Sequence, residues 1–311
     1  MKPWLYAPIG WMAHAAALLP LGALYGVSDL TYFLAFHVAG YRRKVVERHI
    51  ADSFPEKSPH ERHEIVKGFY HNFADYIVET IKLLHISDKT MSSRMTFTNL
   101  QVIDKLVNED RQVMILFSHC FNWEWAPSVT LWLPQHDGNP VEFGQVYRPL
   151  KNKWMDAFML RLRSRFGSRS YPMTGVLREL LRAKRDNRPT VTGFMSDQKP
   201  IWGDVRHVID FMHHPTPTLL GSEELARKLK MSVVYWDISK SSRGHYNIDT
   251  VLITPDASKT AEYEITDRYF ELLSKTINRQ PSLWLWSHKR WKYPYAFEPD
   301  GTPIYSPLSV R

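Results

Sequence analysis

Apolar side chains recur at helical spacing in the segment that follows residue 58. Ser58, Pro59 and Glu61 are typical of a helix start, as an N-cap, a first helical residue and an acid in the first turn. From there to about residue 84 the apolar positions recur every three or four residues, at Ile65, Phe69, Phe73, Ile77, Ile81 and Leu84. The pattern predicts a long amphipathic helix with one buried face.

Residues 113–117 show a different pattern, because all five are apolar. A short, wholly apolar run is typical of a strand that is buried on both faces of a sheet. It leads directly into the polar segment 118–124, Ser-His-Cys-Phe-Asn-Trp-Glu, and then into a helix predicted to end near residue 132. The strand therefore delivers a polar loop to one edge of the predicted sheet.

Helical and extended patterns alternate through the rest of the chain. We expect helices at 151–166, 175–183 and 262–278 and another that begins near Ser222, and Gly167 ends the first of them. Strands are expected to end near residue 147 and to cover 190–194, 205–211, 232–239 and 246–254, the last two joined by a hairpin turn at 241–244. This order predicts an α/β fold with a mixed β-sheet flanked by helices on both faces.

The N-terminal segment is unusually apolar. Residues 9–27 carry no charge, an apolar stretch continues over 30–41, and the basic cluster 42–44 follows. An uncharged run of this length reaches the ~18 residues of a membrane-spanning helix. Pro20 and Asp29 interrupt it, so a bent helix pair in one leaflet and a buried core helix remain alternatives. We expect a hydrophobic membrane-anchor helix within 1–44 and a catalytic domain at 45–311, which the basic cluster places on the cytoplasmic side.

Composition narrows the class of partner. A net charge of +8 suits nucleic acid, anionic lipid or an acidic carrier protein, and the single Cys120 excludes an intrachain disulfide. Eleven tryptophans favour a membrane interface, and segment 284–292 predicts a second lipid contact through Trp284, Trp286, Lys289, Arg290, Trp291 and Lys292. Basic, aromatic-rich segments also occur in nucleic-acid-binding proteins. The uncharged run 9–27 favours the membrane over nucleic acid.

His119 and Glu124 are the strongest candidates for catalysis. Five residues turn a helix by about 500°, so these side chains cannot share a helix face. They can meet if His119 lies on the loop after the strand and Glu124 lies in the first helical turn, with Asn122 as the N-cap. A carboxylate on Nδ1 would leave Nε2 as a general base. The alternative, a His and a Glu that merely bracket a polar loop, stays open on spacing alone.

The sequence around these residues resembles a known family. His119 and Glu124 form a His-x4-Glu motif, similar to that of the glycerolipid acyltransferase superfamily and closer still to the secondary (lauroyl and myristoyl) acyltransferases of lipid A biosynthesis. Further resemblances follow in order along the chain, at 41–46, 53–55, 146–150, 163–167, 197–198 and 284–292. The chain departs from the family pattern at Ser118 and Phe121, where glycines are usual, and over 211–218.

The resemblance implies a glycerolipid-acyltransferase-like fold, attached to the inner membrane with the catalytic domain on its cytoplasmic face. It implies that an acyl thioester, of acyl carrier protein or of coenzyme A, donates the chain to a hydroxyl of a lipid A precursor, with His119 as base and Glu124 beside it. Substrate-binding roles are expected for the following residues: Asn122, Arg148, Arg163, Arg165, Asp197 and Gln198. Arg148 and Asp197 each follow a predicted strand, so we also expect them to form an ion pair, with a plain loop cap as the alternative role of Asp197. No cofactor and no metal are predicted.

Three alternatives remain. Cys120 as a nucleophile is disfavoured, because sequence neighbours near a strand end point to opposite sides and His119 is poorly placed to activate it. A metal site from His119, His213 and His214 has no supporting spacing motif. The acceptor can equally be another lysolipid or an aminolipid, because the acceptor pocket is not readable from motifs.

Overall fold

The computed structural model describes residues 7–133, 135–136, 139–200, 205–292, 296–297 and 303–304 of the chain. Its centre is a seven-stranded sheet in the order β1-β11-β10-β2-β7-β5-β6. The strands are β1 (Met95–Thr98), β2 (Val113–Phe117), β5 (Glu142–Tyr147), β6 (Arg169–Pro172), β7 (Thr190–Met195), β10 (Ser232–Ser242) and β11 (His245–Thr254). All neighbours are parallel except the β10–β11 hairpin, which confirms the predicted mixed sheet.

Three short antiparallel pairs lie outside the main sheet. They are β3 (Gln135–His136) with β4 (Asn139–Pro140), β8 (Val208–Phe211) with β9 (His214–Pro217), and β12 (Ala296–Phe297) with β13 (Pro303–Ile304). The strand expected over 205–211 is thus present only in its second half.

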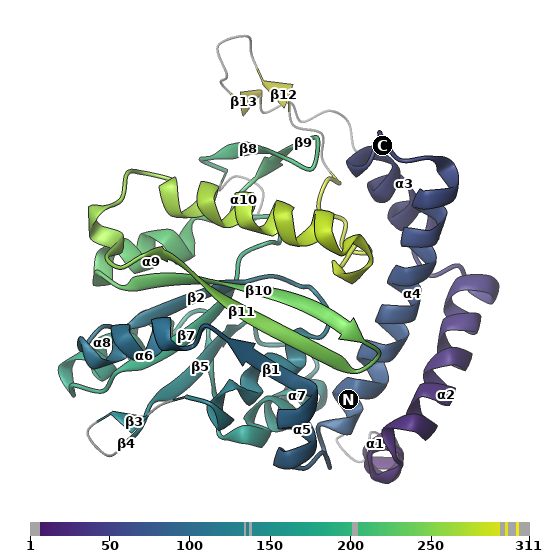
Figure 1. Cartoon of the computed structure of the whole chain (residues 1–311), viewed down its shortest axis with the longest axis horizontal. Coiled ribbons are helices and arrows are strands. Elements are labelled where there is room, and N and C mark those ends of the chain that lie inside the picture. Colours follow the sequence, from purple (N-terminus) through teal and green to yellow (C-terminus); the bar gives the residue numbers. More distant parts are fainter. Residues whose placement is uncertain are drawn as a thin grey trace.

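Helices cover the sheet and one of its ends. They are α1 (Ala7–Leu18), α2 (Leu21–Phe33), α3 (Arg43–Ser53), α4 (Pro59–Lys82), α5 (Asp88–Arg94), α6 (Gln101–Asn108), α7 (Lys153–Arg163), α8 (Val176–Arg185), α9 (Gly221–Leu229) and α10 (Glu264–Arg279). Figure 1 shows α9 and α10 on one side of the sheet and α5 on the other, while α4 and α2 stand side by side at one end. Shorter turns are the π-helix η2 (Leu34–Val38) and the 3-10 helices η3 (Trp123–Leu131), η4 (Ser164–Phe166), η5 (Ala257–Lys259) and η6 (Pro281–Leu283).

Local chemistry explains several of these boundaries. Ser58 caps α4 by a reciprocal capping box with Glu61, so the predicted start is confirmed. All five residues of β2 are buried, as the apolar run predicts. Gly167, at φ 83°, ends the helical segment over 153–166 in the left-handed conformation that favours glycine. The helix expected after residue 122 is η3, a 3-10 helix that contains Pro127.

The N-terminal segment forms two short helices. The break at Leu19 and Pro20 separates α1 from α2, and α2 packs on α4 through buried Leu21 and Leu24. Among the described residues, no helix combines the length and the apolarity needed to cross a bilayer. The expectation of one hydrophobic anchor helix therefore finds no support in the structure.

The aromatic segment near the C-terminus lies inside the protein. Trp284 and Trp286 are 3% and 0% exposed, and Arg290 is 2% exposed. The prediction that these three side chains contact lipid is wrong, because they fill the core beneath α10 and beside the loop after β2. Backbone hydrogen bonds fix them there, from Phe121 N to Leu283 O at 3.0 Å and from Leu285 N to His119 O at 3.1 Å.

Candidate active site

Two neighbouring parallel strands bring His119 and Asp197 together. β2 and β7 pair in parallel with Phe117 opposite Met195. His119 and Asp197 each lie two residues beyond that pair, on loops that leave the same edge of the sheet. Carboxyl ends of adjacent parallel strands are where ligand sites of open α/β sheets form.

Asp197 contacts His119 through both carboxylate oxygens. His119 Nδ1 lies 2.6 Å from Asp197 Oδ1, and the His119 backbone N–H donates to Oδ2 at 3.0 Å. The indole of Trp284 also donates to Oδ2, at 2.9 Å. Burial acts to raise the pKa of Asp197, but the His119 ring, its hydrogen bonds and the Arg290 charge hold that pKa well below its usual value. An ionised Asp197 can only accept, so Nδ1 carries a proton and Nε2 is left as the basic nitrogen.

Glu124 does not reach His119. Its carboxylate accepts two hydrogen bonds from Arg163, from Nε to Oε2 at 2.9 Å and from an outer guanidinium nitrogen to Oε1 at 2.7 Å. The expected contact of Glu124 with His119 Nδ1 is therefore wrong, because Glu124 sits on the first turn of η3 and faces the end of α7. Trp123 links the two groups: its indole donates to Glu124 Oε1 at 3.2 Å, and its ring meets the His119 ring edge-on at 5.2 Å.

Asn122 is the N-cap of η3, as expected. Its Oδ1 accepts from the Glu124 backbone N–H at 3.1 Å, and its Nδ2 donates to Glu79 Oε2 at 2.9 Å. Tyr25 and Tyr246 donate to the same Glu79 carboxylate, each at 2.9 Å. Asn122 is fully buried, so its side chain positions the loop that carries His119 and Glu124.

The other expected arginines lie apart from His119. Arg148 is exposed just beyond β5, and the described residues provide no ion pair for it. The expected pair with Asp197 is wrong, because three hydrogen bonds from His119 and Trp284 already occupy that carboxylate. Arg165 binds the Ile86 carbonyl at 2.9 Å and Asp88 Oδ1 at 3.2 Å.

Cys120 is a buried apolar residue of the loop. It is 1% exposed, and the Ser118 hydroxyl lies 3.2 Å from its sulfur. Burial raises the pKa of its thiol far above the usual value, so the thiolate needed for nucleophilic attack is not formed. The structure thus agrees with the prediction that Cys120 serves as a small hydrophobe.

A narrow cavity, too small to hold a water molecule in this structure, lies beside the His119 ring. Gln198 places its amide nitrogen 3.1 Å from His119 Nε2 and so donates to the basic nitrogen. The remaining lining comes from the loop after β7 and from the C-terminal segment: Asp197, Trp284, Leu285, His288 and Arg290. Burial, and then the nearby Arg290 charge, lower the pKa of His288 to about 4, which keeps this imidazole neutral.

Sequence reasoning did not assign His288, Arg290 or Trp284 to the site. The signal was present in segment 284–292, whose resemblance to the family signature was noted, but its aromatic character was interpreted as a lipid contact. His119 and Asp197 both follow predicted buried strands, but their pairing requires β2 and β7 to be neighbours, and the strand order comes from the structure alone.

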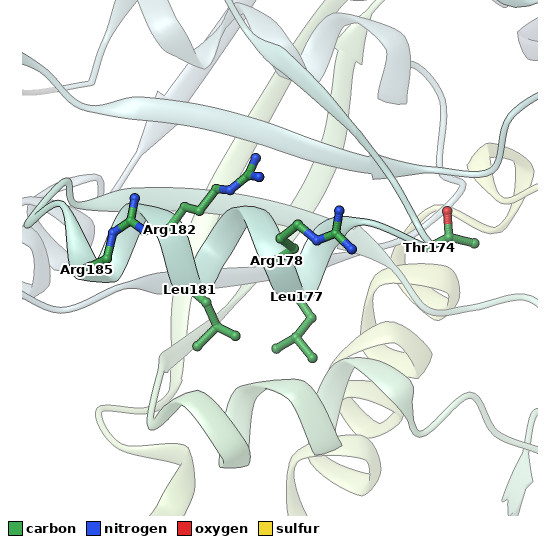
Figure 2. A pocket seen from close by; sticks show the side chains of 6 residues that line it. All are labelled: Thr174, Leu177, Arg178, Leu181, Arg182 and Arg185. Carbon is green, nitrogen blue, oxygen red and sulfur yellow. The ribbon is translucent and has the colours of Figure 1, made fainter.

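A second hollow, larger and open, lies over α8. Figure 2 shows Leu177 and Leu181 on one side of this helix and Arg178, Arg182 and Arg185 on the other. Two of these arginines form ion pairs with neighbouring acids of the same segment, at 2.9 Å each. The groove shares no residue with the cavity at His119 and contains no carboxylate, thiol or imidazole, so it offers no candidate chemistry.

Comparison with known proteins places the chain in a protein family. The family model described as bacterial lipid A biosynthesis acyltransferase matches residues 2–293, which is nearly the whole chain. The comparison with curated proteins gives no match.

Proposed function

The chain belongs to the bacterial lipid A biosynthesis acyltransferase family and is an acyltransferase, and from this premise we propose that His119 is its general base, oriented by Asp197. The observation that carries the proposal is the 2.6 Å contact between His119 Nδ1 and Asp197 Oδ1, with Nε2 turned toward the cavity. A buried carboxylate on Nδ1 fixes the tautomer of the ring and stabilises the imidazolium that forms during the reaction.

The proposed reaction is a direct transfer. His119 Nε2 takes the proton of an acceptor hydroxyl as its oxygen attacks the thioester carbonyl. The tetrahedral intermediate then collapses, the carbon–sulfur bond breaks, and the leaving thiolate receives the proton from the imidazolium. The Gln198 amide, which occupies the position of the acceptor hydroxyl, can turn to donate to the developing oxyanion. No covalent enzyme intermediate is required.

The substrates follow from the family and the charge. The acceptor is proposed to be a phosphorylated lipid A precursor, and the donor an acyl thioester of acyl carrier protein or of coenzyme A. A net charge of +8 suits either anionic substrate. Arg163, with 19% of its side chain exposed, and the exposed Arg148 are proposed phosphate ligands.

An assay with purified full-length protein tests this function. The protein is mixed with a lipid A precursor and an acyl thioester of either acyl carrier protein or coenzyme A. The masses of the products are then measured by mass spectrometry. We expect one additional acyl chain on the precursor and release of free thiol. A lysophospholipid and an aminolipid are offered in parallel, and transfer to one of these without transfer to the precursor would contradict the proposed acceptor.

Glu124 is proposed to act through Arg163 rather than through His119. Glu124→Gln removes the charge that holds the guanidinium, so we expect kcat/KM to fall at least tens-fold, mainly through the KM for the acceptor. Arg163→Lys should cost a similar factor, because lysine cannot reproduce the two parallel hydrogen bonds. Since each residue works only with the other, the double variant should be scarcely worse than either single variant.

The control is Arg185→Lys on α8, which changes an exposed arginine that pairs with Asp186 and lies outside the cavity and the Glu124–Arg163 pair. Its kinetics should remain near those of the wild type. Additive losses for Glu124→Gln and Arg163→Lys would show that the two residues do not act as a unit.

The helices α1 and α2 are proposed to lie in the membrane surface, so that 1–44 is the anchor and 45–311 the acyltransferase domain at the cytoplasmic face of the inner membrane. α2 stands on the outer side of α4 (Figure 1). Large apolar side chains are exposed along α1, α2 and η2: Ile9, Trp11, Met12, Leu18, Val27, Leu30, Phe33, Leu34 and Val38. A patch of this kind marks a lipid or protein contact, and helices too short to span can still embed one face.

The triple variant Trp11→Glu, Leu30→Glu and Phe33→Glu tests this contact. Each buried apolar side chain contributes about 1.5–3 kcal/mol, so vesicle affinity should fall on the order of a hundredfold or more. Flotation with phospholipid vesicles measures the loss. Leu181→Glu on α8 is the control, since Leu181 is 47% exposed outside the patch. Unchanged flotation of the triple variant would remove these helices from the membrane contact.

A further inference from the structure

Arg290 is a charged side chain in the protein interior. It is 2% exposed, and none of its three guanidinium nitrogens has a hydrogen-bond partner among the described residues. Burial of an unpaired charge costs several kcal/mol even after the protein relaxes around it. The fold must therefore contain groups that stabilise this cation without accepting hydrogen bonds.

Aromatic rings supply part of that stabilisation. The guanidinium carbon lies 5.4 Å from the ring centroid of Trp284 and 5.7 Å from those of Phe211 and Phe270. The three rings come from β8, α10 and the C-terminal segment. Guanidinium is weakly hydrated and stacks on aromatic faces, whereas ammonium is strongly hydrated, which explains why arginine suits this position.

Asp197 supplies the opposite charge. Arg290 and Asp197 line the same cavity, and Trp284 connects them, with its face toward the guanidinium and its N–H donating to Asp197 Oδ2 at 2.9 Å. Burial lowers the pKa of Arg290, and the Asp197 charge acts against that loss. The two charges interact through the protein interior, where solvent screening is weak.

We propose that Arg290 is a positioning residue that acts through Asp197, and the inference rests on the proposed role of His119 as base. Its buried charge favours the ionised form of Asp197, and that carboxylate in turn holds the proton of His119 on Nδ1. The imidazole thus keeps the tautomer that Asp197 imposes, with Nε2 as the nitrogen that accepts the proton of the acceptor hydroxyl.

Other titratable groups lie on the elements packed around the loop that carries His119. They come from the loops after β2 and β7, from α4, from η3 with the end of α7, from α10 and from the C-terminal segment: Cys120, Asp197, Lys199, Tyr76, Glu79, Glu124, Arg163, Tyr269 and His288. Burial raises the pKa of Cys120, Tyr76 and Tyr269 and lowers that of His288, so none of these four changes its charge near neutral pH. Burial also raises the pKa of Glu79, but Glu79 binds Asn122, Tyr25 and Tyr246 and lies outside the cavity. A movement of the acidic limb that depends on the charge at position 290 therefore reports the His119–Asp197 pair.

The test is the pH dependence of kcat/KM in Arg290→Met and Arg290→Lys. Methionine fills the ring cage without charge, so the Asp197–His119 pair should take up a proton more easily and the acidic limb should move to higher pH by about one unit. Lysine restores a cation beside Asp197 at a higher desolvation cost, so its limb should lie between those of Arg290→Met and the wild type. Lys289→Met removes an exposed charge one position away and should leave the limb unmoved.

Each outcome bears on the proposal. The proposal is overturned if kcat/KM of Arg290→Met falls on the acidic side at the same pH as in the wild type. A merely structural arginine would change the rate without moving this acidic limb. If Arg290→Met does not fold, the double variant with Asp197→Asn decides: recovered folding supports the charge coupling, and continued failure contradicts it. Full activity of a folded His119→Ala would instead overturn the proposed function itself, which keeps the two failures distinct.

Discussion

Replacing His119 by alanine is expected to abolish acyl transfer while the fold stays intact. Among the described residues, His119 Nε2 is the only basic nitrogen that lines the cavity and belongs to a ring held on its other side by a buried carboxylate. Removal of a general base typically costs ~100–10,000-fold in rate. The measurement is single-turnover transfer to a lipid A precursor, with the melting temperature of the variant as the check on folding.

Cys120→Ser is the matched control, because it alters the next residue without touching the proposed base. Since the thiol is buried and protonated, the serine variant should keep most of the activity. A folded His119→Ala protein with near wild-type rates would exclude the mechanism, and loss of turnover in a stable Cys120→Ser protein would point to a thiol nucleophile.

Much of the sheet was predictable because several of its strands have a clear apolar pattern in the sequence. A wholly apolar run such as 113–117 can be stable only where both faces are covered, and the structure buries it entirely. The long helix α4 was equally clear from its stripe and its capping box. Strand β1 and helix α6 were not predicted, because each is short and its pattern too brief to identify.

The partners of the site residues were harder to predict than their positions. His119, Glu124 and Arg163 were recognised individually, but a five-residue spacing suggested a direct His119–Glu124 contact. The carboxylate that contacts His119 is that of Asp197, which lies 78 positions further along the chain on the loop after β7. The parallel pairing of β2 with β7 brings the two residues together. Such pairing depends on strand order, which a single sequence does not reveal. Trp284 was likewise predicted to contact lipid. The structure buries it instead, and its indole donates a hydrogen bond to Asp197.

Asp197→Asn is expected to cost nearly as much activity as the loss of His119. Two donors, the His119 backbone N–H and the Trp284 indole, point at Oδ2, so an asparagine must place its carbonyl oxygen there. Its NH2 group then faces His119 Nδ1, which must become the unprotonated nitrogen. The proton moves to Nε2, and the ring presents a donor where the reaction needs a base.

The corresponding change in a serine protease triad lowers kcat about 10,000-fold through the same exchange of tautomers. We expect a loss of about 1,000-fold or more here, with little change in the KM for either substrate, because Asp197 contacts the ring and not the substrates. Asp249→Asn is the control: Asp249 lies on β11 and binds Thr98 and Asn99, away from the cavity. Wild-type turnover in a folded Asp197→Asn protein would show that Asp197 does not orient the base, because the amide would then have reversed the imidazole tautomer without consequence.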